Sequence, residues 1–571
     1  MAQFSINGFA KGMDTRRPTW AALASTLYMA KDVVLNNAGD AEVRKAFVEK
    51  FTVPASTKGL RDVEDEIFVF GTAAAPAVPT GVTYQQIVTT GGVHIEQILS
   101  SDLYDGKVYL SALMSDATRR HYYDGAEVSD WFDGRARASF EITAGTAGTI
   151  ATVVVNGVNV LGGAVAWATS HVATAAAVAA QINSYGSTPD YEAVSIGATV
   201  IILADDAAGS TPNGFATAVT VTGDVVVSSL TDMLDGVDDA PQPGAFVRTH
   251  DNKMYSPAGK LLNYSSIDGP TYWNTDEDGA GFVDLSRATS GAETLLAVEA
   301  FLEEMAVFAR KCVQVFHVEA DDLNNKRIQT FRDVGTSSIR AQAAFRETDV
   351  FFMDTYRGVL AIVPSATQNQ FAKITEVGLP IQKFLKAYQA TLTDAVIERA
   401  LAFVEPGAAR FWLVLGERVF VYSWHPVEGI EGWTYFEPGF QIEDYAIAGG
   451  RLYVRAGNVI YLYGGDDDDE YPESGVGEIT FTAFRANAPE RVKKFNGLDI
   501  GAEGTWESRL YASSRDTVGR VVATSVGETF EDGDVGLFEM GANPILKMTR
   551  RSDGYARVCQ LIVNYTPAKS G

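Results

Sequence analysis

The chain has 571 residues, 46% of them hydrophobic and 21% charged, and its 46 Lys and Arg stand against 72 Asp and Glu, a formal net charge of −26. This composition is that of an ordinary globular protein, long enough for about three or four domains. The acidic balance excludes a protein that holds nucleic acid by neutralising phosphates, because that requires clustered Lys and Arg. No apolar run reaches the length of about 18 residues that predicts a membrane span, so none is expected.

The first residues, MAQFSINGFAKGMDTRRP, lack a basic start followed by an apolar segment, so we expect no secretory signal. Cys312 and Cys559 are the only cysteines and lie far apart in the sequence. They form no disulfide framework and no metal-binding cluster, which fits assembly in a reducing cytoplasm. The acidic charge has two interpretations: plain solubility, or a surface that must not hold a passing DNA duplex.

Residues 1–60 are predicted to form an N-terminal arm and hairpin. A strand-like run at 32–35 leads into the turn sequence 36–40, and a second run follows at 42–51. Residues 61–136 then settle into short strands, with examples at 67–70 and 108–113, and end near Trp131. We interpret this segment as the first blades of a propeller.

Residues 137–236 change in composition, with Arg137 as the single basic residue against eight acidic ones. Asn156-Gly157 is typical of a hairpin turn, and 174–184 has apolar residues at helical spacing. The segment therefore predicts an inserted, small β-rich (Ig-like) module with one helix. Because the strand pattern resumes afterwards, the two ends of the insert should lie close together.

Residues 237–477 carry a repeated pattern. The segments 410–422 and 451–463 each read as two aromatic-rich strands joined by a turn, with Gly416 and Gly457 at the turns. Such units recur roughly every 40 to 55 residues, which is typical of a β-propeller. We predict a mainly β fold with a propeller of about six or seven blades. Helical spacing at 380–399 predicts a short helix between blades, and 478–571 predicts a C-terminal β domain that closes the propeller.

Candidate chemistry is sparse. The six histidines show no metal-ligand spacing, and neither a nucleophile elbow nor a phosphate-binding glycine loop occurs. The acidic run 466–470 and the shorter 276–279 lack the alternating spacing of a calcium loop. We therefore expect no enzyme and no catalytic, cofactor-binding or metal-binding residues. A sugar-stacking face remains open against the favoured interpretation, packing within blades; its candidates are Trp273, Trp412, Trp424 and Trp433.

The central segment 251–286 contains the most informative pattern. Two strand-like runs flank the turn 257–260, and the segment continues as LLNYSSIDGPTYWN and then GAGFVDLS. This pattern resembles the nozzle, hub or tail-stabilisation proteins of short-tailed (podovirus-type) bacteriophages. Further matches follow in the same order at 305–316, 334–338 and 349–359, and a partial one lies at 44–47 in the arm. The insert likewise resembles modules inserted in many phage virion proteins.

The resemblance implies a structural virion protein in the phage tail. In that family six copies form a ring at the distal end of the tail, below the adaptor, and continue the DNA ejection channel. The expected partners are further copies of the chain, the tail adaptor protein and transiently the genomic DNA, with tail fibres or a tailspike as further candidates. The alternative that stays open is a carbohydrate-binding or carbohydrate-active propeller used in host recognition. A bacterial surface propeller is disfavoured by the expected lack of a secretory signal.

Overall fold

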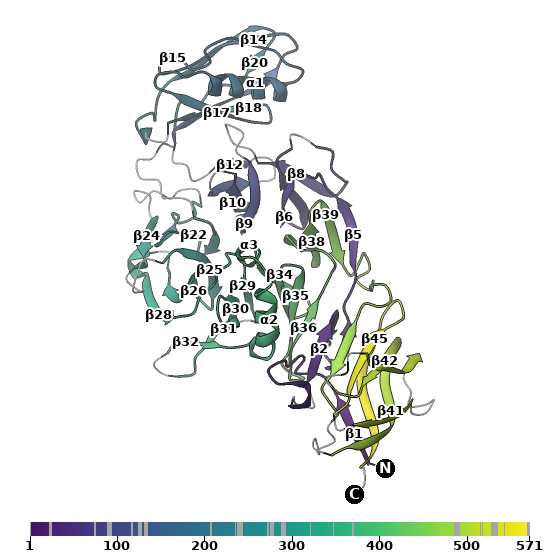
Figure 1. Ribbon diagram of the computed structural model, residues 1–571. Helices are drawn as coiled ribbons and strands as arrows, with labels where there is room; N and C mark the ends of the chain where they lie inside the picture. The colour runs from purple at the N-terminus through teal and green to yellow at the C-terminus, as the bar shows by residue number, and fades with distance from the viewer. Residues whose placement is uncertain are drawn as a thin grey trace.

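The computed structural model consists mainly of β-strands, as the sequence predicts, with three short α-helices among the described residues (Figure 1). It describes residues 2–567, except 22–25, 74–75, 88–93, 116–117, 124–127, 131–134, 206–207, 235, 237–243, 271–272, 274–278, 287–292, 320, 347, 368–369, 485–490, 514–515, 517, 527–534 and 542. Trp131 and residues 276–278, singled out above, therefore lie outside the described residues.

Seven small sheets form the blades of a propeller. The first three are β6 (Thr57–Val63), β7 (Glu66–Gly71) and β8 (Val82–Gln86); β9 (Ile95–Tyr104), β10 (Lys107–Met114), β11 (Thr118–Tyr123) and β12 (Val128–Asp130); and β21 (Arg248–His250), β22 (Lys253–Ala258), β23 (Leu261–Tyr264) and β24 (Gly281–Asp284). The central segment 251–286 thus supplies most of the third blade. Its strands pair antiparallel, as the alternation of strand and turn sequences predicts.

The remaining four blades follow in chain order. They are β25 (Leu295–Phe301), β26 (Glu304–Ala309), β27 (Cys312–His317) and β28 (Lys326–Arg332); β29 (Gln342–Phe345), β30 (Asp349–Asp354), β31 (Gly358–Pro364) and β32 (Ala372–Thr375); β33 (Leu401–Glu405), β34 (Arg410–Leu415), β35 (Arg418–His425) and β36 (Ile430–Phe436); and β37 (Asp444–Ala448), β38 (Arg451–Ala456), β39 (Val459–Tyr463) and β5 (Phe47–Thr52).

The innermost strands of all seven blades surround one axial cavity, which is the signature of a closed propeller. Each of these strands contributes to the cavity wall: β6 Arg61, β9 Ser101, β21 Arg248, β25 Glu299, β29 Gln342, β33 Leu401 and β37 Tyr445. The blade count therefore lies within the predicted range of six or seven.

The N-terminal strand β5 closes the ring. It pairs antiparallel with β39, with Val48 opposite Leu462, and so completes the blade that β37 begins. This differs from the expectation that residues 478–571 close the propeller. Because β5 is hydrogen-bonded to β39 of the last blade and the chain continues from it into β6 of the first blade, the ring cannot open without breaking a sheet.

The turns and helices of this region follow local rules. Gly416 and Gly457 lie in the left-handed region, with φ of 58° and 59°, as predicted for their hairpin turns. The expected helix at 380–399 is instead two helices, α2 (Gln382–Gln389) and α3 (Asp394–Glu398), after the 3-10 turn Leu379–Ile381. The Tyr388 hydroxyl accepts from the Glu417 backbone N–H at 3.2 Å, so α2 supports the β34–β35 turn.

The inserted module has a hydrophobic core of its own, drawn entirely from residues 136–233 among those described. Its strands are β13 (Arg137–Ala144), β14 (Gly148–Val155), β15 (Val158–Asn159), β16 (Val165–Ala166), β17 (Tyr191–Ile196), β18 (Thr199–Ala204), β19 (Thr217–Gly223) and β20 (Val226–Val227). They form two small sheets, and α1 (His171–Ser184), capped by Ser170, packs on the sheet of β13, β17 and β18. Arg137 and Leu234 exchange backbone hydrogen bonds of 2.8 and 2.9 Å, which confirms that the ends lie together.

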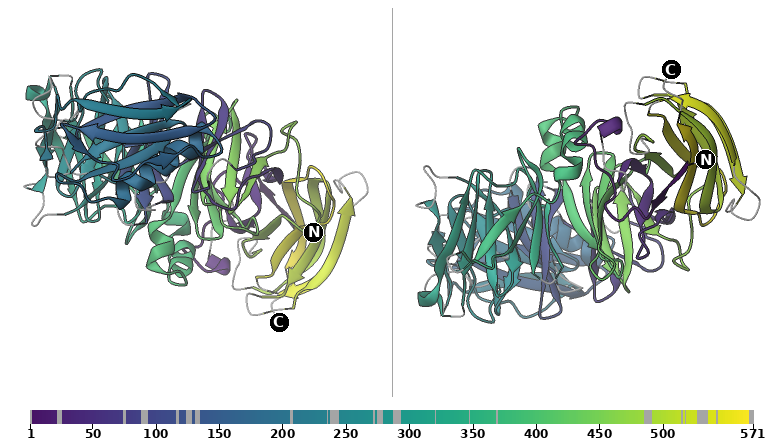
Figure 2. Two further views of the ribbon diagram at one scale, coloured as in Figure 1. Left: turned by 90° about the horizontal axis from the view of Figure 1, so that it is seen from above. Right: turned by 90° about the horizontal axis from the view of Figure 1, so that it is seen from below.

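A two-layered domain, which we call the terminal sandwich, unites both ends of the chain. One sheet contains β1 (Ala2–Asn7), β3 (Val33–Leu35), β4 (Ala41–Val43), β41 (Lys493–Glu503), β44 (Val535–Gly541) and β46 (Arg557–Pro567). The other contains β2 (Leu27–Lys31), β40 (Glu478–Phe481), β42 (Thr505–Tyr511), β43 (Arg520–Val526) and β45 (Ile545–Arg550), and β2 joins it to the blade of β33–β36. Figure 2 shows this domain, with both marked chain ends, beside the propeller.

One hydrophobic core runs through the terminal sandwich and the adjoining blades. It includes Phe351 and Phe411 from the propeller together with Leu546 and Leu561 from the sandwich. The propeller and the sandwich therefore pack as one unit, whereas the inserted module lies at the opposite end of the molecule with its separate core (Figure 1).

Candidate functional site: the polar axis of the propeller

Charged side chains collect at the axis of the propeller. Arg61, Arg248, Glu299 and Asp444 project from innermost strands, and Arg340 lies two residues before β29. Their neighbours on the same strands are of two kinds: Val298 belongs to a hydrophobic core, whereas Asp62 and Tyr445 also line the axial cavity. The fold thus brings together charges that lie far apart in the sequence.

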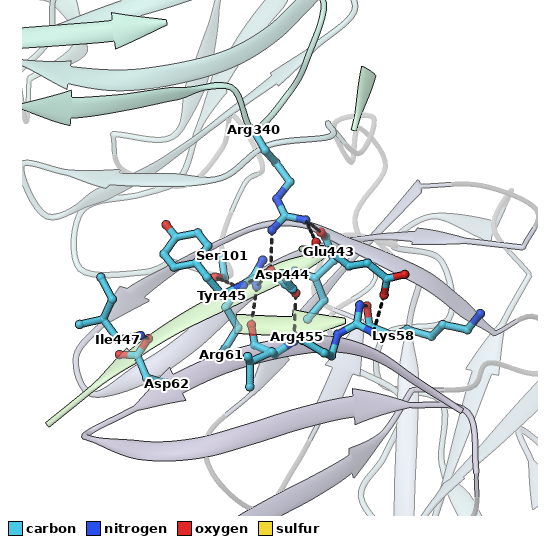
Figure 3. A network of polar contacts seen from close by, with 12 residues as sticks. Lys58, Arg61, Asp62, Ser101, Arg340, Glu443, Asp444, Tyr445, Ile447 and Arg455 are labelled. Atoms are coloured by element: carbon cyan, nitrogen blue, oxygen red, sulfur yellow. Dashed lines mark hydrogen bonds and ion pairs between the residues drawn. The ribbon is translucent and has the colours of Figure 1, made fainter. Parts of the chain in front are cut away.

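Asp444 is the centre of this group (Figure 3). Its side chain is fully buried, and its Oδ1 forms ion pairs with Arg61 Nη1 at 2.5 Å and with Arg340 Nη2. The backbone N–H groups of Leu60 and Tyr445 donate to the same carboxylate at 2.9 and 3.1 Å. One carboxylate therefore connects the blades that begin with β6, β29 and β37.

The electrostatics of Asp444 favour the charged form. Burial alone would raise the pKa of this carboxyl, but the guanidinium groups of Arg340, Arg61 and Arg455 and the Leu60 N–H outweigh it, so its pKa lies below the ordinary value. A carboxylate held ionised in this way is unsuited to accept a proton as a general base near neutral pH. The ion pairs of Asp444 with Arg61 and Arg340 instead hold the blades together.

A second ion pair lies across the same axis. Arg248 Nη2 contacts Glu299 at 2.6 Å, and Asp102 accepts from the Thr249 N–H at 2.7 Å while its Oδ2 stands 3.8 Å from Arg248 Nε. Burial raises the pKa of Glu299, and Arg248 offsets only part of this effect. These contacts connect the blades that begin with β9, β21 and β25, so the two groups together reach six of the seven blades.

The cavity between these groups has a volume of about 240 Å³, room for about eight water molecules at liquid density. Gln342 lines it, and its Oε1 is buried and has no hydrogen-bond partner among the described residues. A buried amide oxygen of this kind is ordinarily satisfied by ordered water. We therefore interpret the cavity as a solvated polar core lined by ion-paired side chains.

The four tryptophans considered for sugar stacking do not form a common exposed face. Trp273, Trp412 and Trp433 are buried, with exposures of 5%, 0% and 1%. Their indole N–H groups donate to the Pro270 carbonyl at 2.8 Å, Glu405 Oε2 at 3.0 Å and the Val377 carbonyl at 2.8 Å. Trp424 is half-buried under the Arg346 guanidinium, 4.6 Å from the ring centre. The favoured interpretation, packing within and between blades, is confirmed for the three buried rings.

Two carboxylates of the acidic run 466–470 pair with lysines of the N-terminal segment. Asp466 contacts Lys50 at 2.5 Å, and Asp468 contacts Lys45 at 2.7 Å. Across the part of the chain that the structure describes, no group of three or more His, Cys, Asp or Glu is arranged to hold a metal ion. The same described residues include no helix with the length and hydropathy to cross a membrane.

No protein-family model and no curated protein matches this chain. Solved structures with similar strand arrangements include the β-propeller domain of Cps50 (Swd1) from Myceliophteria thermophila, with a TM-score of 0.24, 10% identity, 45% of this chain and 94% of that chain covered. Hsv2 from Kluyvelomyces marxianus has a TM-score of 0.24 and 9% identity, with 42% of this chain and 62% of that chain covered. An exo-β-1,3-galactanase from Phanerochaete chrysosporium, solved with galactose, has a TM-score of 0.18 and 8% identity, with 56% of this chain and 96% of that chain covered. These TM-scores are too low to carry an argument, so the propeller assignment rests on the sheet topology and the shared axis.

Proposed function

We propose that this chain is a structural subunit of a phage tail, a nozzle or hub protein whose copies form a ring around the DNA ejection channel. The observation that carries the proposal is the single hydrophobic core that joins the propeller to the terminal sandwich. Since a wall that contains a channel must keep its shape, an element whose parts share a packed core suits this role. The resemblance of segment 251–286 to such proteins supports the same function.

The propeller axis is not the DNA channel in this proposal. A cavity of about 240 Å³, lined by Arg61, Arg248 and Glu299, has no room for a duplex. The DNA would pass through the space enclosed by several copies, and each propeller would form part of the surrounding wall. The axial ion pairs would then act only to keep each wall element closed.

The net charge of −26 supports a wall that does not retain DNA. Acidic side chains facing a lumen repel the phosphates of a passing duplex, and at physiological salt this repulsion acts over about 8 Å. Close to the wall, a duplex would therefore slide rather than bind. Under the same proposal, the protein is located in the virion, next to an adaptor protein. It would have no enzymatic activity.

Carbohydrate recognition remains the competing function, and the burial of Trp273, Trp412 and Trp433 removes its best candidate residues. Two measurements on the purified protein separate the functions: its mass in solution by light scattering, and its depolymerising activity on host polysaccharide. A ring without such activity supports the wall function. A monomer that binds or cleaves polysaccharide would refute it.

A further inference from the structure

The charge of the chain is divided unevenly between the two ends of the molecule. Residues 1–46 and 478–571, which include the terminal sandwich, carry 18 basic and 16 acidic side chains. Residues 47–477, which hold the propeller and the inserted module, carry 28 basic and 56 acidic side chains. The sandwich is therefore the part of the molecule through which two copies approach with the least net repulsion.

The terminal sandwich has an open side. Among the described strands, β43 is the last strand of one sheet and β44 the last strand of the other, and these two edge strands contact each other. The outer backbone groups of an edge strand are a ready template for pairing with another chain. β43, with the sequence RVVATSV, is rich in β-branched residues and carries a single charge, so it lacks the charges that commonly protect such edges.

Exposed apolar side chains gather at one end of this open side. We call Val492, Val518, Val521 and Met540 the edge patch; their exposures are 47%, 75%, 44% and 62%. The pairing registers of the strands place these residues at the same end of the sandwich. Met540 of β44 lies opposite Lys494 of β41, and Lys494 follows Val492 by two residues. The start of β43 pairs with the end of β42, and that same end of β42 pairs with the start of β45. The connection from β44 to β45 is short, so the end of β44 and the start of β43 lie at the same end of the sandwich.

We propose that the edge patch and the β43–β44 edge form a contact surface for a second copy of this chain, as one half of the interface between neighbours in a ring. This inference rests on the proposed ring. An apolar patch on a charge-balanced surface has the composition of a permanent interface between copies. In a ring of more than two members the two halves of each contact differ, so the edge patch meets a different surface of the next copy. The inserted module lies at the far end of the molecule from the edge patch (Figure 1).

The test compares two double variants of the full chain that add the same charge. Val521→Asp with Met540→Asp places two carboxylates in the edge patch. The control, Leu323→Asp with Val427→Asp, places them at propeller sites that are 88% and 92% exposed. The edge variant should need at least about tenfold more protein to assemble, equivalent to about 1.4 kcal/mol, because it buries charge at the contact. The control should assemble like the wild type, with the assembled fraction measured by light scattering against concentration.

Hydrogen exchange on the wild-type protein gives a second measurement that does not depend on a variant folding. Backbone amides of β43 and β44 should become protected as concentration drives assembly. Rings that form equally well in the edge variant, or assembly without protection of β43 and β44, would overturn this contact while leaving the ring intact. A wild-type chain that stays monomeric at every concentration, or gains protection there only with an adaptor protein, would overturn both the contact between copies and self-assembly into a ring.

Discussion

The Asp444 carboxylate holds two guanidinium groups at the propeller axis, and its loss should be costly. Asp444→Asn keeps the size of the side chain but leaves Arg61 and Arg340 buried without their shared counter-charge. We expect the free energy of unfolding to fall by about 3–5 kcal/mol, the usual cost of breaking a buried ion pair on one side. Chemical denaturation monitored by tryptophan fluorescence measures the loss. Asp466→Asn, which affects an exposed pair with Lys50, is the matched control and should change stability little.

The same carboxylate predicts a pH dependence with a definite sign. The pKa of Asp444 is lower in the folded chain than its ordinary value. Its stabilising contribution is therefore fully present above the pKa of the unfolded state, about 3.9, and is lost as the pH falls through the folded pKa. The stability difference between wild type and Asp444→Asn should be constant near neutral pH and should shrink under acid conditions. A difference that instead grew as the pH fell would contradict the ionised assignment.

Gly457 tests the hairpin geometry at a single position. Its φ of 59° lies in the left-handed region, and a Cβ there would meet no atom within 4 Å. Gly457→Val should therefore destabilise by backbone strain alone, by about 1–3 kcal/mol. The control is Gly186→Val, because Gly186 has equally open space without a left-handed φ. Thermal melting by circular dichroism compares the two; equal melting temperatures would show that the turn adopts another conformation.

Among the structural elements, the inserted module should be removable. Its core is separate, and Arg137 and Leu234 are hydrogen-bonded neighbours. Replacing residues 138–236 with a short glycine linker should leave a soluble propeller and sandwich, because the linker has only a short gap to span. Limited proteolysis and the melting temperature of the remaining chain measure the result. Loss of protease-resistant product would show that the insert supports the blades.

Most of the blades could be predicted because their hairpins are encoded locally. Gly416 and Gly457 mark turns between aromatic strands, and Asn156-Gly157 marks another, with φ of 45° and 83°. The closure by β5 could not be predicted in this way, since Val48 and Leu462 pair across most of the chain and no local pattern records the partner. The interruption of the 380–399 helix was also missed, although Thr391 and Thr393 are weak helix formers.

The polar axis was missed because each charged residue is unremarkable by itself. Arg61, Glu299 and Asp444 each belong to a short strand that is otherwise largely buried. A signal was present, however: charged residues recur in the innermost strands β6, β9, β21 and β25 of the first four blades and again in β37. Pairing between these charges depends on ring closure, so the repeat indicates a shared environment but not which residues form ion pairs.

At the scale of the whole molecule, the net charge determines the affinity of the protein for DNA. At −26, the chain should show no measurable affinity for duplex DNA at physiological salt, because no clustered basic surface is expected to displace counterions. A fluorescence anisotropy titration with labelled duplex measures this. Tight, salt-sensitive binding would reveal a basic lumen patch beneath the acidic total and would contradict a channel along which DNA slides.

Added salt should favour assembly of the copies. Copies that repel one another through acidic propellers approach more easily when salt shortens the range of repulsion from about 10 Å at 0.1 M to about 3 Å at 1 M. The concentration needed for assembly should therefore fall as salt rises, as light scattering across a salt series would show. Assembly that weakened with added salt would indicate an interface dominated by ion pairs.

The most direct test of the ring is an electron micrograph of the purified protein at a concentration and salt that favour assembly. The proposed function predicts closed rings with about six copies, propellers in the wall and a central opening wide enough for a DNA duplex. Class averages that show only single, elongated molecules, or closed assemblies without a central opening, would contradict it.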